Sequence, residues 1–352
     1  MNRSIRIGNR EISEKTNTYV IAEMSGNHNM DFDRAVKIIQ AAKESGADAI
    51  KLQTYTADTI TINSDKKWFQ ITQGTLWDGT TLYNLYQKAY TPWEWQPKLK
   101  DIANDIGIDL FSSPFDHSSV DFLEHMEVPA YKIASFEITD IPLIRKIARL
   151  GKPIIISTGI ATLSDIELAI KTCKEESNEN VILLKCCSSY PSPYEDINLK
   201  TMVNIADTFD CIVGLSDHTL GDSVALAGVA MGAKVIEKHL TLSRADGGVD
   251  ADFSMEPNEF KQMVDNIRIV EKAIGEVTYE LTEKQLSGRQ FSRSLFIVKD
   301  MKAGDILDEF NMKSIRPSNG LQTIYYDELL GKRIIKDVDA GTPLGWDLID
   351  FS

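Results

Sequence analysis

Cysteine, histidine and positive charge are scarce in this chain of 352 residues. Its four cysteines lack the spacing of a zinc site, so they predict reduced thiols rather than a disulfide-bonded or zinc-stabilised scaffold. The 38 lysines and arginines face 52 aspartates and glutamates, and the net charge of -14 argues against nucleic acids and anionic membranes as partners. Long apolar runs are missing as well, which predicts a cytoplasmic protein with no membrane-spanning segment.

Short apolar runs rich in β-branched residues recur through the first part of the chain. Eight of them lie at residues 19–23, 48–53, 109–113, 130–135, 153–158, 181–187, 211–216 and 234–240. Segments with apolar residues three and four apart, typical of amphipathic helices, lie between most of these runs. Eight strands that alternate with helices predict an α/β fold, namely a (β/α)8 TIM barrel.

The pattern changes after residue 275. Residues 276–290 have no apolar periodicity and are typical of a linker, whereas residues 291–352 contain short strand-like runs between Gly and Pro turns. We therefore expect a catalytic barrel over residues 1–275, a linker over 276–290 and a small β-rich domain over 291–352.

One gap in the barrel pattern is long, because roughly 55 residues separate the second predicted strand from the third. This insertion contains four of the five tryptophans. Since it follows the carboxyl end of a strand, it can cover the barrel mouth as a lid or specificity loop, or its tryptophans can form an additional packing layer. The sequence leaves both alternatives open.

Polar side chains stand at the end of every predicted strand, although the same strands begin with apolar residues. In a TIM barrel the carboxyl ends of the strands face the active site. Each of these residues has an ordinary structural explanation taken alone, but together they predict a catalytic barrel mouth. They are Glu23, Lys51, Gln53, Ser112, Ser113, Lys132, Ser135, Ser157, Lys185, Ser216, His218, Glu237 and His239.

Two of the five histidines end consecutive predicted strands. One strand–helix unit separates His218 from His239, so both are expected in the same mouth, within reach of one divalent metal ion. Two imidazoles leave room for water and substrate, and Glu23 is placed to orient such a water. His28, just after the first strand, is expected near the same mouth. A histidine with a purely structural role remains the alternative for each.

Lysine and serine side chains at other strand ends predict an anion site. Lys51 and Lys132, with Ser113, Ser135 and Ser157, supply the cations and hydroxyls that an acidic protein needs to hold a phosphate or carboxylate. A lysine that forms a Schiff base, as in an aldolase, is the alternative. Several lysines beside a predicted metal favour anion binding, since a metal and a Schiff base are usually alternative ways to activate a carbonyl.

A set of motifs in fixed order resembles the sialic acid synthase family. The motifs are IAEMSGNHN, ADAIKLQTY, SSPFD, AYKIASFE, IISTGIA, LLKCCSSYP, GLSDHT and VIEKHLT, and in the tail KSIRPSNGL and LLGKR are similar to the antifreeze-like (SAF) domain of that family. Within the family, LWDGTTLYNLYQKAYTPWEW, KCCSSYPSP and FSRSLF are most similar to the pseudaminic acid branch. Ala134 and Phe136 stand where N-acetylneuraminate synthases more often have glycine, which indicates a differently shaped sugar pocket.

The resemblance implies a transferase that condenses phosphoenolpyruvate with an amino-sugar aldehyde and releases phosphate. For the pseudaminic acid branch the sugar is 2,4-diacetamido-2,4,6-trideoxy-L-altrose, and the N-acetylneuraminate and legionaminate branches are the alternatives. The resemblance implies a divalent cofactor, Mn or Mg, on His218 and His239, with Glu23 orienting the attacking water. A Schiff-base aldolase and a non-enzymatic carbohydrate- or ice-binding protein are the rival interpretations.

The family's other site residues carry over by motif. Phosphoenolpyruvate-binding positions match Lys51, Ser113, Lys132, Ser135, Ser157 and Ser216, and positions that contact the sugar match Gln53, Tyr190 and Asp250. Glu137 matches a pocket carboxylate, and Ser188 stands where family members often have asparagine. Arg316, in the small domain, matches a position that reaches into a partner subunit's active site, and this implies a domain-swapped homodimer.

Overall fold

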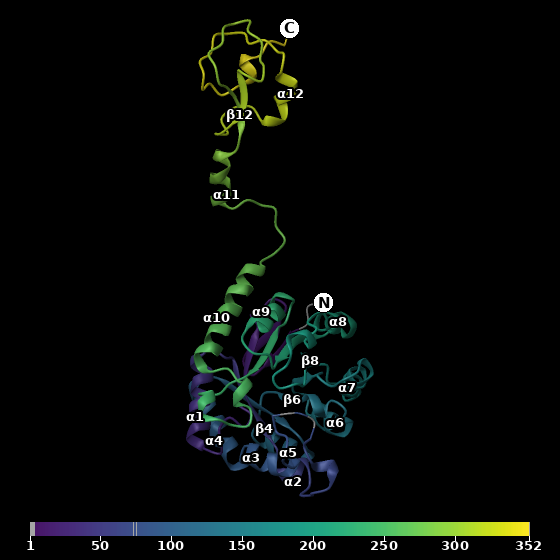
Figure 1. Ribbon diagram of the computed structural model, residues 1–352. Coiled ribbons are helices and arrows are strands. Elements are labelled where there is room, and N and C mark those ends of the chain that lie inside the picture. The colour runs from purple at the N-terminus through teal and green to yellow at the C-terminus, as the bar shows by residue number, and fades with distance from the viewer. Residues whose placement is uncertain (1–3, 73, 75, 352) are drawn as a thin grey trace. The chain divides into compact units, whose positions relative to one another are not determined.

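The computed structural model describes residues 4–72, 74 and 76–351. The chain divides into two compact units, Met1–Gly275 and Glu276–Ser352 (Figure 1). Among the described residues, no helix is both long and apolar enough to cross a membrane.

Eight parallel strands form a closed barrel in the first unit, which confirms the predicted TIM barrel. In barrel order they are β3 (Tyr19–Glu23), β4 (Ala49–Thr54), β5 (Asp109–Pro114), β6 (Tyr131–Ile133), β7 (Ile154–Ser157), β8 (Val181–Cys186), β9 (Ile212–Asp217) and β10 (Val235–His239). The barrel closes where β10 pairs in parallel with β3, from Val235 opposite Tyr19 to His239 opposite Glu23.

Helices follow the strands and cover the outside of the barrel (Figure 1). In chain order they are α1 (Phe32–Glu44), α4 (Gln96–Ile106), α5 (His117–His125), α6 (Ile141–Ala148), α7 (Leu163–Glu175), α8 (Lys200–Phe209), α9 (Ser223–Ala230) and α10 (Pro257–Ile274). Helix α1 illustrates why they form: Asp31 caps its first turn, and its buried residues recur three and four apart, so one stripe packs on the strands. Short 3-10 turns complete the unit at η3 (Ser135–Glu137), η4 (Tyr194–Asp196), η5 (Arg244–Asp246) and η6 (Ala251–Phe253).

The aromatic insertion after β4 contains α2 (Ala57–Ile60), η1 (Lys67–Phe69), α3 (Leu82–Ala89) and η2 (Trp93–Trp95). Three of its four tryptophans divide between the two predicted roles, whereas Trp68 is exposed. Trp93 donates to the Tyr55 carbonyl at 3.1 Å, and Trp95 packs edge-on against the His28 ring, so these two form a packing layer. Trp77 instead donates to the Val249 carbonyl at 2.9 Å, in the loop that follows β10. The insertion therefore also reaches the carboxyl end of the barrel.

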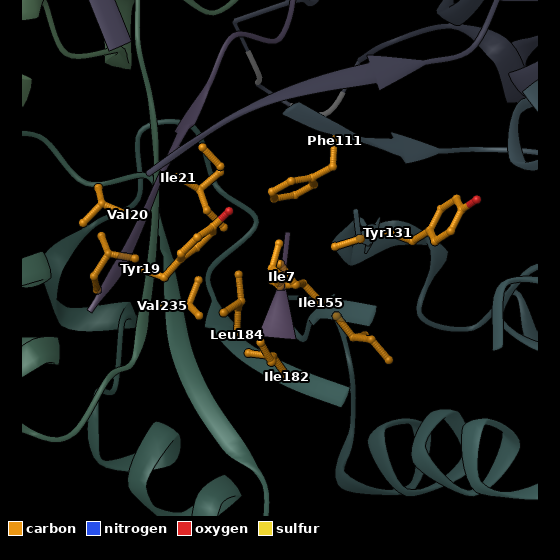
Figure 2. Close-up of a cluster of buried hydrophobic side chains, with 14 of the residues drawn as sticks. Ile7, Tyr19, Val20, Ile21, Phe111, Tyr131, Ile155, Ile182, Leu184 and Val235 are labelled. Atoms are coloured by element: carbon orange, nitrogen blue, oxygen red, sulfur yellow. The ribbon is translucent and has the colours of Figure 1, made fainter. Parts of the chain in front are cut away.

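An antiparallel hairpin, β1 (Ser4–Ile7) and β2 (Arg10–Ser13), lies at the amino end of the barrel. Its Ile7 is fully buried, and Figure 2 shows the side chain among those of Ile155, Ile182 and Leu184 from the barrel strands. The turn residue Gly8 lies against Asp109, the first residue of β5. The hairpin thus fills the end of the barrel opposite the strand carboxyl ends.

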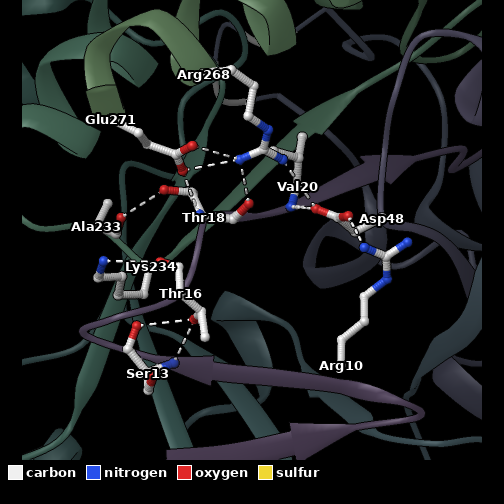
Figure 3. A network of polar contacts seen from close by, with 10 residues as sticks. All are labelled: Arg10, Ser13, Thr16, Thr18, Val20, Asp48, Ala233, Lys234, Arg268 and Glu271. Carbon is white, nitrogen blue, oxygen red and sulfur yellow. Dashed lines mark hydrogen bonds and ion pairs between the residues drawn. The ribbon is translucent and has the colours of Figure 1, made fainter. Parts of the chain in front are cut away.

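A polar network ties the same end together (Figure 3). The Asp48 carboxylate accepts from the Val20 amide at 2.8 Å and pairs with Arg10 at 2.5 Å and Arg268 at 3.5 Å. Arg268 of α10 also pairs with Glu271 at 2.9 Å. These contacts join the hairpin, strand β3 and the last barrel helix, so this end serves stability and leaves the opposite end for chemistry.

The second unit has its own small core. Strands β11 (Ser294–Ile297) and β12 (Met312–Ile315) pair antiparallel, and short helical pieces follow at η8 (Thr323–Tyr325), α12 (Tyr326–Leu329) and η9 (Trp346–Leu348). The predicted linker contains helix α11 (Glu283–Gly288), capped by Thr282, and the turn η7 (Arg289–Phe291) crosses its end. The core is formed by Leu295, Ile297, Met301, Leu307, Met312, Leu329, Ile334, Val338, Leu344, Leu348 and Ile349.

The hairpin turn generates a stability prediction. Gly8 has φ +54°, and an added Cβ would lie 2.7 Å from Asp109 Oδ1. The other oxygen of this carboxylate, Oδ2, accepts a hydrogen bond from the Tyr19 hydroxyl at 2.8 Å. Gly8→Ala should therefore lower the free energy of unfolding by about 2–3 kcal/mol, through left-handed backbone strain plus the collision. Urea unfolding measures this loss.

Gly151→Ala is the matched control. Gly151 has φ +70°, and no described residue lies within 4 Å of the Cβ that alanine would add. This variant should lose only the backbone contribution, about 1 kcal/mol. Equal losses in the two variants would contradict the proposed packing of the hairpin against β5.

Candidate active site

Alternate residues of the barrel strands point into the mouth, because successive side chains of a strand face opposite sides. On β10 this places Glu237 and His239 on the inner face and Lys238 on the outer face. On β8 the inner residue at the strand end is Cys186, whereas Lys185 lies on the other face and donates to the Cys186 carbonyl at 2.6 Å. Lys185 is therefore separate from the cluster of strand-end residues that the sequence predicted it would join.

Four charged side chains meet in the barrel mouth. Lys51 Nζ lies 3.0 Å from Glu23 Oε2 and 3.5 Å from Glu237 Oε1. Lys132 Nζ lies 4.0 Å from the same Glu237 oxygen, which also accepts from the Ser216 hydroxyl at 3.1 Å. All four charged residues are at most 4% exposed. Glu237 was recognised as a strand-end residue but not as a site residue, although its place two residues before His239 was a usable signal.

Burial and the nearby lysines shift the pKa values of the two carboxylates in opposite directions. Burial raises the pKa of Glu23 to about 7, although Lys51 opposes the shift. Burial would also raise the pKa of Glu237, but Lys132 and Lys51 together hold it below its usual value. Near neutral pH, Glu237 is therefore a fixed negative charge, and Glu23 can gain or lose a proton.

The two lysines extend toward serine hydroxyls. Lys132 Nζ donates to Ser157 Oγ at 2.6 Å, and Lys51 Nζ donates to Ser113 Oγ at 3.4 Å. Burial lowers the pKa of Lys132, whereas for Lys51 the effect of burial is outweighed by Glu23 and Glu237, which raise the pKa. Cations beside hydroxyl donors suit a phosphate or a carboxylate.

A second hydroxyl cluster follows β6, β7 and β8. Ser188 Oγ donates to Ser135 Oγ at 2.8 Å, and Ser135 Oγ accepts from the Ile160 amide at 3.0 Å. Gly159 leaves the necessary space, since an added Cβ would lie 2.2 Å from Ser188 Oγ and 2.7 Å from Ser135 Oγ. Ser188, which the motif resemblance placed at a substrate position, therefore lies in this hydroxyl cluster.

The rings of His218 and His239 lie with their centroids 5.4 Å apart. His218 Nδ1 is 2.9 Å from the Cys187 carbonyl, to which it donates, so in the neutral ring Nε2 carries the lone pair. Burial lowers the pKa of His218, but Cys186 and the bond to Cys187 outweigh it and raise the pKa. His239 Nδ1 is buried and has no hydrogen-bond partner among the described residues. Burial lowers the pKa of His239 well below its usual value, which keeps the imidazole in its neutral, metal-binding form.

Among the described residues, no group of three His, Cys, Asp or Glu side chains forms a ready metal cluster. His239 Nδ1, which lies 4.0 Å from Asp250 Oδ2 and makes no hydrogen bond within the described part of the chain, and the oriented ring of His218 nevertheless fit a divalent ion that completes its coordination with water and substrate. Cys186, which sequence reasoning missed, lies beside this pair with its Sγ 3.8 Å from His218 Nδ1.

A hydrogen-bond chain crosses the mouth from Glu23 to the loop after β10. Gln53 Nε2 donates to Glu23 Oε1 at 2.9 Å and to Ser25 Oγ at 3.1 Å, and the Ser25 hydroxyl donates to Asp250. Burial raises the pKa of Asp250. The structure thus brings the predicted sugar contacts Gln53 and Asp250 into one network, through a serine that the sequence did not single out.

Aromatic rings form one wall of the site. The Tyr190 ring lies 4.5 Å from the His218 ring, 5.3 Å from Phe253 and 5.7 Å from Trp77, measured between centroids. Phe253 also packs edge-on against His239 at 4.9 Å. Phe253, in the short turn η6, escaped sequence reasoning because its segment shows no strand or helix periodicity, whereas Trp77 belongs to the insertion that the sequence left open as a lid.

Three further predicted residues, Glu137, Arg316 and His28, take no part in the site contacts described above. Glu137, in η3, has a buried Oε2 without a hydrogen-bond partner among the described residues, and burial raises its pKa to about 7 against the opposing charge of Lys132. Arg316 is exposed and belongs to the second unit, directly after β12. His28 hydrogen-bonds through both ring nitrogens, to Thr91 and the Met30 amide, so the structural alternative holds for it.

Comparison with known proteins identifies the family. The NeuB family model matches residues 38–279, and the SAF domain model matches residues 292–350. The chain belongs to the NeuB family. It is 47% identical to the pseudaminic acid synthase of Campylobacter jejuni (strain 81-176), over 97% of this chain and 98% of that protein. The pseudaminic acid synthase of Helicobacter pylori (strain 26695) is 46% identical, with 95% and 98% covered.

A solved structure agrees with this membership. N-acetylneuraminic acid synthetase from Leptospira borgpetersenii, crystallised with citrate, superimposes with a TM-score of 0.73 at 30% identity, covering 82% of this chain and 95% of that one. The predicted sialic acid synthase family, the barrel and the carboxyl-terminal SAF domain are therefore confirmed.

The buried His28 generates a pH prediction. Burial lowers its pKa from 6.5 to about 4, so the folded state excludes a proton that the unfolded chain accepts. The stability that this group contributes is present above pH 6.5 and is lost as the pH falls toward 4. Between pH 7 and pH 5 this linkage should cost about 2 kcal/mol of unfolding free energy.

His28→Gln should remove this part of the acid sensitivity, although it is less stable than the wild type at pH 7. Urea unfolding of both proteins at pH 7 and pH 5 measures the difference. If the wild type and the variant lose the same free energy between the two pH values, His28 is not neutral in the folded protein.

Proposed function

We propose that the protein is a pseudaminic acid synthase. It condenses phosphoenolpyruvate with 2,4-diacetamido-2,4,6-trideoxy-L-altrose and releases pseudaminic acid and phosphate. The observation that carries the proposal is the 46–47% identity to pseudaminic acid synthases over nearly the whole chain. The buried lysines, hydroxyls and histidines at the barrel mouth supply groups suited to this chemistry.

The reaction balances without an oxidant or reductant. C3 of phosphoenolpyruvate attacks the aldehyde carbon of the open-chain sugar, and the aldehyde oxygen gains a proton as it becomes a hydroxyl. Water then adds at C2 and loses one proton. The tetrahedral C2 expels phosphate by cleavage of its bond to the phosphate oxygen.

The two lysines bind the anionic substrate. Lys51 and Lys132 present ammonium groups to the carboxylate and phosphate of phosphoenolpyruvate, and Ser113, Ser157 and Ser135 donate hydrogen bonds to the same oxygens. In this acidic protein a local cation pair is required, because the overall field repels a trianion. Glu237 favours the charged form of both lysines in the low dielectric of the buried mouth.

Glu23 moves the proton of the attacking water. Its pKa of about 7 means that a carboxylate is available near neutral pH and that the acid form is not costly afterward. Gln53 donates to one oxygen and Lys51 pairs with the other, so the carboxylate has a single orientation. These two contacts make Glu23 a positioned base rather than a mobile one.

The histidine pair would hold the cofactor. His218 and His239 would bind a divalent ion, which supplies Lewis-acid polarisation of the sugar aldehyde when bound. Tyr190 packs on His218 and fixes the ring plane. Tyr190, Gln53 and Asp250 contact the sugar. Manganese or magnesium as the ion, and the cytoplasmic location, are predictions that come from the sequence.

Phosphate release from phosphoenolpyruvate tests this function. The protein is treated with EDTA and assayed with and without Mn²⁺ or Mg²⁺, with the diacetamido altrose sugar, N-acetylmannosamine and the legionaminic acid precursor offered in parallel. We expect release only with the altrose sugar and an added metal. Preference for another sugar would keep the chemistry but reject the pseudaminic acid branch. Turnover without metal would reject the role of the two histidines.

Arg316 is proposed to complete the active site of a partner subunit in a domain-swapped homodimer. Its exposure, in a unit joined to the barrel by a stretch of exposed residues, is compatible with this role. An inactive Arg316→Ala chain mixed with an inactive Glu23→Ala chain should recover activity, because some mixed sites combine two intact contributions. Differently tagged chains verify that mixed dimers form, and their presence without any activity would reject the swap.

A further inference from the structure

A buried ion pair lies directly behind the two histidines. Lys238 Nζ is 2.7 Å from Asp217 Oδ2 and donates to the Thr219 carbonyl, also at 2.7 Å. Lys238 and Asp217 are each 1% exposed. Asp217 immediately precedes His218, and Lys238 immediately precedes His239. Neither charged residue takes part in the proposed chemistry.

The pair lies on the outer face of the barrel wall. Glu237 and His239 face the mouth, so Lys238, between them in β10, faces the opposite side. The register of β9 and β10 places Lys238 directly opposite Asp217. The ion pair therefore links the two strands at the position where both are about to present a histidine.

Asp217 also shapes the turn that holds His218. Its Oδ1 accepts from the Thr219 amide at 2.9 Å and from the Thr219 hydroxyl at 2.8 Å. Because Lys238 binds both Asp217 and the Thr219 carbonyl, the residues on each side of His218 are attached to one ammonium group. That ammonium belongs to the neighbour of His239.

Stability alone is a weak reason for such an arrangement. Removing two charges from water is costly, and well-packed apolar residues often replace a buried ion pair without loss of stability. The pair instead fixes how the ends of β9 and β10 lie relative to each other, because its charge-assisted hydrogen bonds join the two backbone segments in a defined geometry. Outer contacts of this kind commonly set the orientation of metal-binding side chains.

We propose that Lys238, Asp217 and Thr219 are positioning residues that set the spacing and orientation of His218 and His239, and thereby the affinity for a divalent cation. This inference rests on the metal role given to the histidines in the proposed function. The three residues act only through the histidine backbones and do not touch substrate.

The first test neutralises the pair without leaving an unpaired charge. In the double variant Lys238→Met/Asp217→Asn, the asparagine can still accept from Thr219, but the link to β10 is gone. We expect the dissociation constant for Mn²⁺ to rise by about 10- to 100-fold. The electron paramagnetic resonance signal of free Mn²⁺, titrated against the full-length protein without substrate, measures it independently of turnover.

Two further proteins calibrate the titration. His239→Ala should lose Mn²⁺ binding, since it removes a proposed ligand. Lys152→Met/Glu124→Gln removes another ion pair of the barrel, at 2.8 Å and remote from the histidines, and should bind Mn²⁺ as the wild type does. Thermal unfolding of all the variants separates lost affinity from lost structure.

Thr219 provides a milder test that does not depend on the double variant folding. Thr219→Val is nearly isosteric and removes only the hydroxyl bond to Asp217, so Mn²⁺ affinity should fall by about fivefold, the equivalent of one hydrogen bond. Thr219→Ser keeps the hydroxyl and should retain wild-type affinity. If Thr219 has a purely structural role, Thr219→Val should unfold at a lower temperature but bind Mn²⁺ with the same affinity as Thr219→Ser.

The outcomes distinguish this inference from the proposed function. If His239→Ala abolishes Mn²⁺ binding while the Lys238/Asp217 double variant and Thr219→Val bind as the wild type does, the positioning role is wrong and the metal role stands. If the wild type binds no Mn²⁺, or His239→Ala binds it normally, both are wrong. Weakened binding in the double variant and in Thr219→Val, with both controls as expected, supports the inference.

Discussion

The pairing of β10 with β3 closes the barrel, and the site depends on that closure. This contact puts His239 opposite Glu23, and the next ladder puts Glu23 opposite Lys51. Three chemically active side chains from distant parts of the chain thus stand in one row. A shift of one residue in either register would turn them to the outer face, because side chains alternate along a strand.

Two effects on the charged residues of the mouth act against each other, and their balance sets the pKa of each residue. Burial favours the neutral forms, whereas the lysines and carboxylates favour one another's charged forms. Glu237 lies near both lysines and keeps its negative charge, whereas Glu23 contacts only Lys51 of the two and has a pKa of about 7. Two cations suited to an anion and a carboxylate with a pKa near 7 thus come from the same four residues.

The opposite end of the barrel carries the contacts that resist unfolding. The hairpin with Ile7 fills the interior there, and Asp48 with Arg268 ties the first strand to the last helix (Figures 2 and 3). Separation of this network from the barrel mouth lets the mouth keep costly features, such as the buried His239 Nδ1 that has no hydrogen bond to any residue the structure describes. The outer pair of Lys238 and Asp217 is an exception, since it lies beside the chemistry while pointing away from it.

The sequence by itself determined the order of strands and helices, the change of pattern after residue 275, and which strand ends carry polar residues. These are local properties, set by side-chain periodicity and turn residues. Only the tertiary structure decided that Glu237 joins both lysines, that Lys185 points away, and that His28 is a packed structural residue. It also brought Phe253 and Trp77 to the site from loops. The reason is physical: pKa shifts and partners depend on contacts across a closed barrel, and no local pattern specifies those distances.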